Sequence, residues 1–428
     1  MSRLTRVDLA TLSAAERRRI TRRSAVPDPE VRSRVADICR AVRDGGDAEV
    51  AAIAARVGGG FRRITDSELD AAVASLDDQL RAALHTAIAA VTEFHRAQLP
   101  TDLEVATAPG VAITRTWAPL RRVGAYVPGG KAAYPSTVIM TVVPARVAGV
   151  EEIVVASPEA PDGTVPQVML AACRMAGATE VWAMGGAQAI AALAYGTESV
   201  EPVEKIVGPG NAWVTAAKLE VFGTCAIDLP AGPSEVLVLA DSTSEPTLVA
   251  VDLLCQAEHG PDSPAVLVTT DPDLVDAVEA EIERLLPGLE RAEILSKALS
   301  DHGLAVVAPD REAALTFANE YASEHVTILT ANPEADAAEI HAAGSVYVGA
   351  WAPESAGDYA TGANHVLPTG GLAEACGPLS TLDFGSWRQV QRLTREGLEA
   401  IAPTITELAR AEGLTAHRLA AQIRLEER

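Results

Sequence analysis

Residues 124–157, GAYVPGGKAAYPSTVIMTVVPARVAGVEEIVVAS, contain the pattern that decides the fold. A short β-branched run rich in glycine is followed by a helical segment around Ser136 to Ala148 and then by a second apolar run, IVVAS. Short apolar strands that alternate with helices are typical of βαβ units, whose parallel sheets are covered by helices on both faces. The stretch therefore predicts an α/β fold.

The same alternation continues along the chain. It passes through the runs EVWAMGG, KIVGPG and EVLVLAD, and after one further helical segment it resumes with AVLVTT, LAVVAP, VTILT and SVYVG. The likeness of the two series suggests an internal duplication. We therefore predict two Rossmann-like parallel-sheet domains in tandem, with a polar N-terminal arm and a helical C-terminal tail.

The domain boundaries follow from changes in this pattern. The chain is expected to be mostly helical up to Gln98, and from Trp387 onward we expect helices without strands. Both ends are suited to packing on another subunit, since the tail is short for an independent domain. The predicted units are an arm at 1–25, an α/β domain formed by 26–121 with 235–380, a second α/β domain at 122–234, and a helical dimerisation tail at 381–428.

Composition restricts the classes of function. The chain has 428 residues, of which 48% are hydrophobic, enough for two or three domains with their own cores. It carries 35 Lys and Arg against 58 Asp and Glu, a formal charge of −23, which argues against a general affinity for nucleic acid or anionic membranes. No apolar run approaches the ~20 residues that span a bilayer. Small-molecule chemistry is favoured.

The cysteines and the N-terminus indicate the compartment. Five scattered cysteines without a C-x-x-C pair predict neither a disulfide framework nor a cysteine-zinc site, and a cytoplasmic location is expected. The basic N-terminus is interrupted by Asp8 and Glu16 and has no apolar core, so it does not resemble a secretory signal. Its arginines are Arg3, Arg6, Arg17, Arg18, Arg19, Arg22 and Arg23.

A possible metal site lies in residues 251–263, VDLLCQAEHGPDS. Gln256 and His259 are three positions apart and share a helix face, so both could bind one ion. Zinc is almost always held by at least three protein ligands, and the others must come from elsewhere. The alternative is structural, because Gln and His near a helix C-terminus often cap its carbonyls.

Three further groups could carry chemistry. Glu324 and His325 lie at a helix-to-strand junction, where a carboxylate beside an imidazole can do acid/base work, although His325 could equally cap its helix. The loop at 355–371, SAGDYATGANHVLPTGG, has Asp358 and His365 and is expected to be functional, with Tyr359, Val366 and Leu367 as its anchors. The last group is His417, with Glu412 five residues before it, and alone it is explained as well by helix capping.

Three glycine-rich strand ends could bind a nucleotide: 124–131, 184–189 and 207–213. Glycine at a strand end lets a ligand approach the backbone, and the following helix N-terminus favours an anion such as a pyrophosphate. No G-x-G-x-x-G is present, and a tight βα turn explains each stretch by itself. Because all three stretches lie in one α/β unit, a dinucleotide site explains them as well as tight turns do.

Eight motifs resemble those of the histidinol dehydrogenase family, in the family's order and over nearly the whole chain. They are YVPGG, GGAQAIAALAYGT, VGPGNAWV, AGPSEVLVLAD, QAEHGPDS, SEHVTI, SAGDYATGANHVLPTGG and EGLTAH. The resemblance implies a zinc enzyme that oxidises L-histidinol to L-histidine with two NAD⁺, by way of an enzyme-held aldehyde. It also implies a homodimer whose C-terminal tail reaches the neighbour's site.

The resemblance assigns roles to individual residues. The acid/base pair would be Glu324 and His325; His325 would take the alcohol proton and Glu324 would activate water to hydrate the aldehyde. The zinc ligands would be Gln256, His259, Asp358 and His417, and the NAD⁺ contacts Tyr126, Gln188 and Asn211. The substrate contacts would be Ser234, Gln256, His259, His325, Asp358, Glu412 and His417, of which Glu412 and His417 would act in trans.

Other readings stay open. A relative with the same zinc site could oxidise another polar alcohol, a zinc hydrolase could use Glu324 without a dinucleotide, and a dinucleotide-binding module could lack catalysis. Cys255 could suggest a thiohemiacetal, but an apolar helix without a basic partner favours a small core residue. The remaining histidines match no motif and are expected to be structural or on the surface: His85, His95, His302 and His341.

Overall fold

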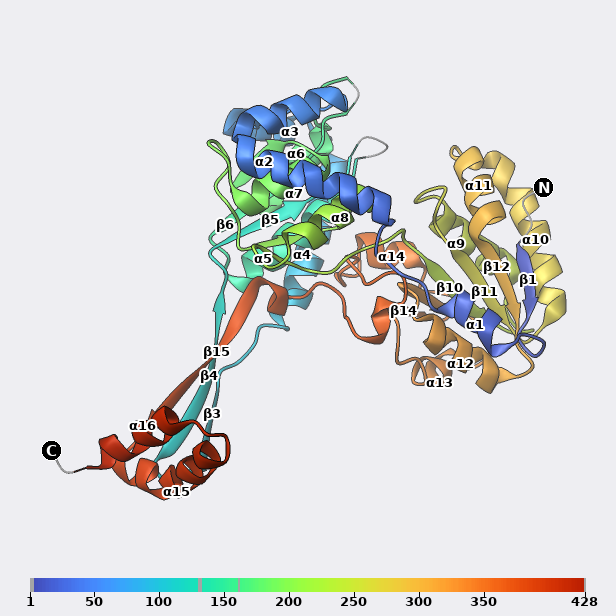
Figure 1. The fold of residues 1–428 in the computed structure, drawn as a ribbon. Helices are drawn as coiled ribbons and strands as arrows, with labels where there is room; N and C mark the ends of the chain where they lie inside the picture. Colours follow the sequence, from blue (N-terminus) through green and yellow to red (C-terminus); the bar gives the residue numbers. More distant parts are fainter. Residues whose placement is uncertain (1–3, 130–132, 161, 427–428) are drawn as a thin grey trace.

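The computed structural model describes residues 4–129, 133–160 and 162–426. Two six-stranded sheets form two α/β units that lie beside each other, and a three-stranded antiparallel sheet projects from the first unit toward the C-terminus (Figure 1). A mixed α/β fold with parallel sheets is thus confirmed. Within the described ranges, no helix combines the length and apolar character that a membrane crossing requires.

The first sheet has the order β2-β7-β6-β5-β8-β9, and all its pairs are parallel except β2 with β7. Successive residues of its strands alternate between two apolar cores, Val123 and Ala125 facing one and Tyr126 the other. This alternation explains why its strands read as continuous apolar runs. Its strands are β2 (Arg62–Arg63), β5 (Arg122–Tyr126), β6 (Glu152–Ser157), β7 (Glu180–Ala183), β8 (Lys205–Val207) and β9 (Ala226–Ile227).

Helices cover both faces of the first sheet. They include an N-terminal group that the sequence assigned to the other domain: α2 packs on α7 and α8, α3 on α6, and α4 on α5. The apolar stripe of α2, with Val35 and Ile53, completes a core that α7 cannot bury alone. The helices are α2 (Pro29–Arg56), α3 (Asp66–Ser75), α4 (Asp78–Arg96), α5 (Pro135–Ala148), α6 (Gln167–Ala176), α7 (Gly186–Tyr195) and α8 (Ala212–Val221). The prediction that groups 26–121 with 235–380 is therefore corrected.

The second sheet is wholly parallel, with the order β1-β12-β11-β10-β13-β14. Its core strand β10 directs Val236 and Val238 to one apolar cluster and Leu237 and Leu239 to the other. Its strands are β1 (Thr5–Asp8), β10 (Val236–Ala240), β11 (Ala265–Thr269), β12 (Gly303–Val307), β13 (His325–Ile328) and β14 (Ser345–Val348).

The N-terminal residues belong to this second unit. Strand β1 pairs with β12, and the Arg6 guanidinium forms ion pairs with Asp276 and Glu279. The solvated arm expected from the sequence is thus an edge strand followed by a helix that packs on α12; the expected arm residue Arg3 lies outside the described residues. The helices of this unit are α1 (Ala14–Thr21), α9 (Pro246–Ala257), α10 (Pro272–Leu285), α11 (Ala292–His302), α12 (Arg311–Tyr321), α13 (Pro333–Ala337) and α14 (Glu354–Tyr359). Short 3₁₀ turns are η1 (Leu286–Gly288), η2 (Leu372–Glu374) and η3 (Thr381–Phe384).

The C-terminal tail contains a strand that the sequence did not predict. Strand β15 pairs antiparallel with β4 along its whole length, with Trp387 opposite Trp117. The guanidinium of Arg115 lies 4.0 Å from the Trp387 ring centroid, so a polar-looking segment gains apolar and cation–π contacts. The elements are β3 (Leu103–Ala108), β4 (Val111–Pro119), β15 (Gly385–Leu393), α15 (Arg395–Ala411) and α16 (Thr415–Leu425).

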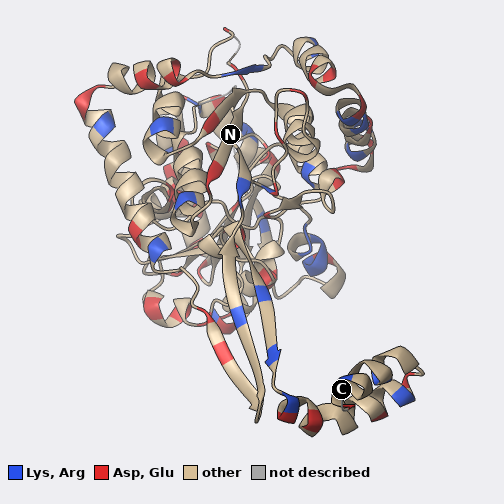
Figure 2. Ribbon diagram, turned by 90° about the vertical axis from the view of Figure 1, so that its left-hand side faces the viewer, with Lys and Arg blue, Asp and Glu red and all other residues tan. Residues whose placement is uncertain are grey.

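Helices α15 and α16 pack on each other at the far end of the three-stranded sheet, away from both α/β units (Figures 1 and 2). We call β3, β4, β15, α15 and α16 the C-terminal extension. Four large apolar side chains of its helices are exposed: Leu408, Leu414, Leu419 and Ile423.

A buried histidine fastens the glycine-rich loop after α14 to the first unit. Asn364 donates to the His95 ring at 3.2 Å and to the Met140 carbonyl at 2.8 Å, while His95 Nδ1 lies 2.8 Å from the Val91 carbonyl. Nδ1 therefore donates and Nε2 accepts, so the ring is held neutral. The prediction that His95 is structural fits this contact, and His85, His302 and His341 are exposed.

His95→Ala should lower the free energy of unfolding by about 2 to 4 kcal/mol, because it opens a cavity and removes a partner of a buried amide. His85→Ala, on the exposed side of the same helix, is the control and should change stability by less than about 0.5 kcal/mol. Urea denaturation of both variants measures the difference. Equal effects would contradict the role given to His95.

The same contact has a pH signature. Burial lowers the pKa of His95 from 6.5, so the unfolded chain takes up its proton first as the pH falls. The stabilising effect of His95 is thus present above about pH 6.5 and is lost as the pH falls toward the lower folded-state pKa. The alanine variant should lose less stability than the wild type between about pH 7 and pH 5.

Candidate active site

Residues from three segments meet at the amino ends of the second sheet's central strands. Strand β13 begins at His325, directly after Glu324, and β10 begins two residues after Ser234. Helix α9 packs on α14 and ends just before His259. The predicted acid/base and metal residues are therefore brought together by the parallel pairing of β10 with β13 and by the packing of two helix ends.

Glu324 is almost wholly buried and is held by two donors. The Ser234 hydroxyl donates to Oε2 at 2.6 Å, and the Glu235 backbone N–H donates to the same oxygen at 2.9 Å. Burial raises the pKa of Glu324 well above 4.5, and these hydrogen bonds only partly oppose the effect. A carboxylate with such a raised pKa is a stronger base than an exposed one.

His325 presents an unpaired nitrogen. Its Nδ1 lies 3.3 Å from the Glu235 carbonyl oxygen, which fixes Nδ1 as the donor, and its Nε2 is buried without a hydrogen-bond partner among the described residues. Burial, and then the nearby His259, lower the pKa of His325 to about 3. The ring is neutral, and Nε2 can accept a proton.

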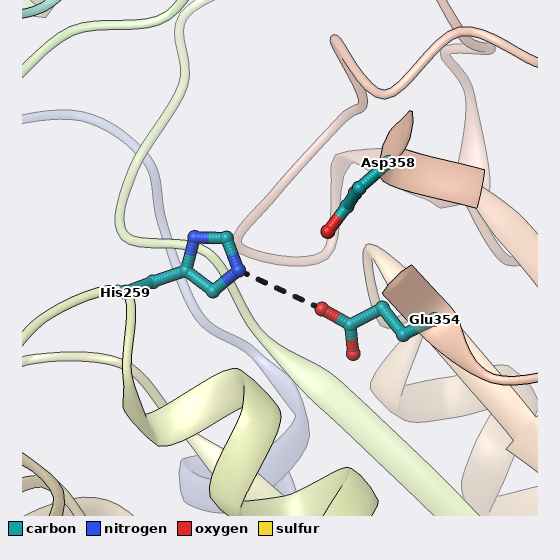
Figure 3. Close-up of side chains that lie close together, drawn as sticks. All are labelled: His259, Glu354 and Asp358. Atoms are coloured by element: carbon teal, nitrogen blue, oxygen red, sulfur yellow. Dashed lines mark ion pairs between the residues drawn. The ribbon is translucent and has the colours of Figure 1, made fainter. Parts of the chain in front are cut away.

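Figure 3 shows His259, Glu354 and Asp358 pointing toward one another. Their ligand atoms all lie within 4.8 Å of one another, and His259 Nε2 is 3.8 Å from Glu354 Oε1. Gln256, one turn before His259, is fully buried, and neither atom of its amide has a partner among the described residues. Nitrogen and oxygen ligands of this kind fit a divalent cation.

Burial disfavours the charged forms of the two carboxylates in this cluster. Burial raises the pKa of Asp358 to about 6. Burial raises the pKa of Glu354 well above 4.5, and the charges of Asp358 and Glu324 add to the effect. Both carboxylate oxygens of Glu354 lack a hydrogen-bond partner in the described chain. A cation at this point would relieve the repulsion.

Glu354 was not found from the sequence. It precedes Asp358 by four residues on the short helix α14, so both face the same side. That E-x-x-x-D spacing was the available signal. Glu354 also lies 3.8 Å from His325 Nδ1, and so it links the possible metal ligands to the acid/base pair.

Two predicted residues lie elsewhere in the chain. Glu412 caps the end of α15 and His417 lies on α16, and both are exposed in the C-terminal extension. His417 is not part of the His259 cluster in the described residues of a single chain. The role of both residues in trans stays a prediction.

The predicted dinucleotide contacts all lie at the carboxyl edge of the first sheet. The Tyr126 hydroxyl, at the end of β5, accepts a hydrogen bond from Gly186 N–H at 3.1 Å, and Gln188 lies in the first turn of the helix that Gly186 begins. Asn211 caps α8, its side-chain oxygen accepting from Trp213 N–H at 3.0 Å and from Val214 N–H. Gly130 and Lys131, at the end of the first glycine-rich stretch, lie outside the described residues.

Strands β5 and β8 are neighbours in the sheet, and the chain leaves them in opposite directions, toward β6 and β9. Such a switch point at the carboxyl edge is where open α/β sheets bind ligands.

The glycine-rich loop at 355–371 carries a second unpaired imidazole. His365 Nε2 is buried without a partner among the described residues, and burial lowers the pKa of His365 to about 4. Of the expected anchors, Val366 and Leu367 are buried, but Tyr359 is 63% exposed and anchors nothing.

Burial raises the pKa of the Cys255 thiol to about 12, in keeping with the prediction of an unreactive cysteine.

Comparison with known proteins identifies the family of this chain. The family model for histidinol dehydrogenase matches residues 21–425. The histidinol dehydrogenase of Methanothermobacter thermautotrophicus is 45% identical over 93% of this chain and 94% of its own, and that of Halobacterium salinarum is 48% identical over 93% and 94%. The crystal structure of the enzyme from Elizabethkingia anophelis matches with a TM-score of 0.92 and 35% identity, over 99% of this chain and 98% of that one.

His259→Ala and Asp358→Ala should each weaken the binding of a divalent cation by about 100-fold or more, because each removes a ligand from the cluster. The exposed neighbour Glu258→Ala is the control and should bind the cation as the wild type does. Competition with a metal-sensitive dye, after dialysis against a chelator, measures the affinities. Unchanged affinity in both ligand variants would exclude a metal site here.

Proposed function

The chain belongs to the histidinol dehydrogenase family, and on that premise we propose that it oxidises L-histidinol to L-histidine with two NAD⁺, by way of histidinaldehyde. The observation that carries the proposal is the contact between three parts of one site. A neutral His325 with a free Nε2 lies beside the buried Glu324, and Glu354 joins this pair to the His259 and Asp358 cluster.

Zinc is the proposed metal, one ion per subunit. Gln256, His259 and Asp358 would hold it together with His417 from a second copy of the chain. The unpaired amide of Gln256 supports this set, because a buried amide without a partner is expensive unless a ligand satisfies it. When bound, the ion would orient the substrate through its amine and imidazole and stabilise developing negative charge on oxygen.

NAD⁺ is the proposed oxidant in both steps. Tyr126, Gln188 and Asn211 would bind it at the carboxyl edge of the first sheet. The bound dinucleotide would accept one hydride in each half-reaction. The strand orders β7-β6-β5-β8-β9 and β12-β11-β10-β13-β14 are alike, which supports a tandem Rossmann-like description.

The protein's own groups would handle the protons. In the first half-reaction His325 Nε2 would take the hydroxyl proton of histidinol as the hydride leaves its carbon. In the second, Glu324 would take a proton from the water that adds to the aldehyde carbon, and His325 would take the proton of the hydrate hydroxyl. Glu324 suits its step because Ser234 and the Glu235 N–H fix its Oε2 while burial keeps its basicity high.

We also propose a homodimer with shared sites. In one chain, His417 and Glu412 are exposed on helices that pack away from both α/β units, and apolar side chains are exposed beside them. A second copy would cover these side chains and receive Glu412 and His417 at its own site, where Ser234 would complete the substrate contacts. A cytoplasmic location stays a prediction.

NADH formation with histidinol tests the activity. Zinc-loaded protein should reduce two NAD⁺ for each histidinol consumed, followed by NADH absorbance and by histidine analysis. Turnover with another polar alcohol alone would favour the related dehydrogenase. A zinc hydrolase or a non-catalytic nucleotide module would produce no NADH.

His325→Ala should reduce both half-reactions by about 1,000-fold, because general-base catalysis contributes about 10²–10⁴-fold. Glu324→Gln should slow the oxidation of the aldehyde more than that of the alcohol, because only the aldehyde must be hydrated. Steady-state rates from histidinol and from histidinaldehyde separate the two effects. Loss of zinc from either variant, or equal loss of both half-reactions in Glu324→Gln, would contradict these roles.

Mixed dimers test the shared site. His417→Ala and His325→Ala subunits should each be inactive alone, yet refolding them together should restore about a quarter of wild-type activity, since half the dimers are mixed and each has one intact site. Activity after co-refolding is the measurement, and each variant refolded alone is the control. If co-refolded mixtures stay inactive, His417 acts within its own chain or not at all.

A further inference from the structure

A buried ion pair lies directly beneath one of the dinucleotide turns. Lys218 lies on α8, and its ammonium pairs with the carboxylate of Asp228, which follows β9. Both side chains are 2% exposed. The ion pair belongs neither to the possible metal cluster nor to the acid/base pair.

The pair satisfies both backbone polar groups of one glycine. Lys218 Nζ donates to the Gly208 carbonyl at 3.0 Å, and Asp228 Oδ2 accepts the Gly208 N–H at 2.8 Å. The second oxygen of Asp228 accepts from Leu229 N–H at 2.7 Å. The Gly208 N–H and carbonyl and both Asp228 oxygens therefore all have partners.

Gly208 needs to be held in this way. It follows β8 with φ at +108°, a conformation that other residues rarely adopt. A Cβ at this position would lie 2.2 Å from the Tyr126 carbonyl oxygen, so the turn passes directly against the end of β5. Three residues later Asn211 caps the N-terminus of α8. The shape of the Gly208 turn thus sets the distance between Asn211 and Tyr126.

Stability alone is a weak reason for such a pair. Replacing a buried ion pair by apolar side chains of similar volume is often neutral or stabilising, because both charges must be desolvated. What an apolar pair cannot do is donate to the carbonyl and accept from the N–H of Gly208. The specific effect of Lys218 and Asp228 is therefore on the geometry of this turn.

We infer that Lys218 and Asp228 are positioning residues for the nicotinamide dinucleotide. They hold Gly208 against β5 so that Asn211, Tyr126 and Gln188 present one preformed surface to the cofactor. The inference rests on the proposed function, because it takes this sheet edge to be the NAD⁺ site. It adds two residues that touch no cofactor and act through the backbone.

The test is the affinity for NAD⁺ of the zinc-loaded full-length protein, measured by calorimetry. Lys218→Met/Asp228→Leu keeps the volume but leaves Gly208 unpaired, and it should raise the Kd and the KM for NAD⁺ by about 10- to 100-fold. The KM for histidinol at saturating NAD⁺, and the zinc content, should change by less than about twofold. Lys218→Gln, which keeps a donor but removes the charge, should weaken NAD⁺ about fivefold, and it decides the matter if the double variant does not fold.

Arg122→Met is the matched control. Arg122 is 3% exposed and pairs with Glu152 at 2.5 Å and Glu180 at 3.0 Å, at the opposite end of β5 from Tyr126. Loss of the Arg122 ion pairs should lower the midpoint of thermal unfolding and leave the affinity for NAD⁺ unchanged.

Wild-type NAD⁺ affinity in either folded Lys218 variant would overturn the inference, as would equal weakening in Arg122→Met. If the wild type itself binds no NAD⁺, the proposed function fails and the inference falls with it. Unchanged binding in a variant contradicts the positioning role alone.

Discussion

Two of the three places where the chain crosses between the α/β units are joined by a hydrogen bond. The Gly232 N–H, in the crossing from β9 to β10, donates to the Thr369 hydroxyl, in the return crossing from β14 to β15, at 2.6 Å. The outgoing crossing carries Ser234, and the return crossing carries Asn364 and His365. Because the outgoing crossing leaves β9 at its carboxyl end and enters β10 at its amino end, the carboxyl edge of the first sheet meets the amino edge of the second.

This meeting of a carboxyl edge with an amino edge explains why the proposed NAD⁺ contacts and the proposed acid/base residues come from different sheets. Ligands of open parallel sheets usually bind at carboxyl ends, and the proposed NAD⁺ site, with Tyr126 and the Gly208 turn, follows that rule. The second sheet does not, since Glu324 and His325 precede or begin β13. Buried carboxylates gather at this amino edge, where desolvation raises the pKa of Glu324, Glu354 and Asp358 alike. The edge is suited to a cation and to proton transfer.

Sequence reasoning could find what is local. Apolar runs alternating with helices predicted the parallel sheets, and the spacing of Gln256 and His259 predicted a shared helix face, although His259 lies two residues beyond Ala257, the last residue of α9. It could not find what depends on distant partners. The packing of α2 on α7 and α8, the pairing of β15 with β4, and the role of β1 as an edge strand all join segments far apart in sequence. Glu354 was missed because a single carboxylate on a six-residue helix carries little signal until its neighbours are known.

The edge strand β1 also sets an order of events during synthesis. Thr5 pairs with Leu304, 299 residues later, whereas the first sheet is complete once Ile227 has emerged. At roughly 5–20 residues per second, the N-terminal strand waits about 15 to 60 seconds for its partner. The middle of the chain can therefore fold before its beginning does, and during that interval residues 4–8 are a strand without a sheet. A ribosome-bound chain stalled before β12 would expose this segment to chaperones, while its first sheet was already formed.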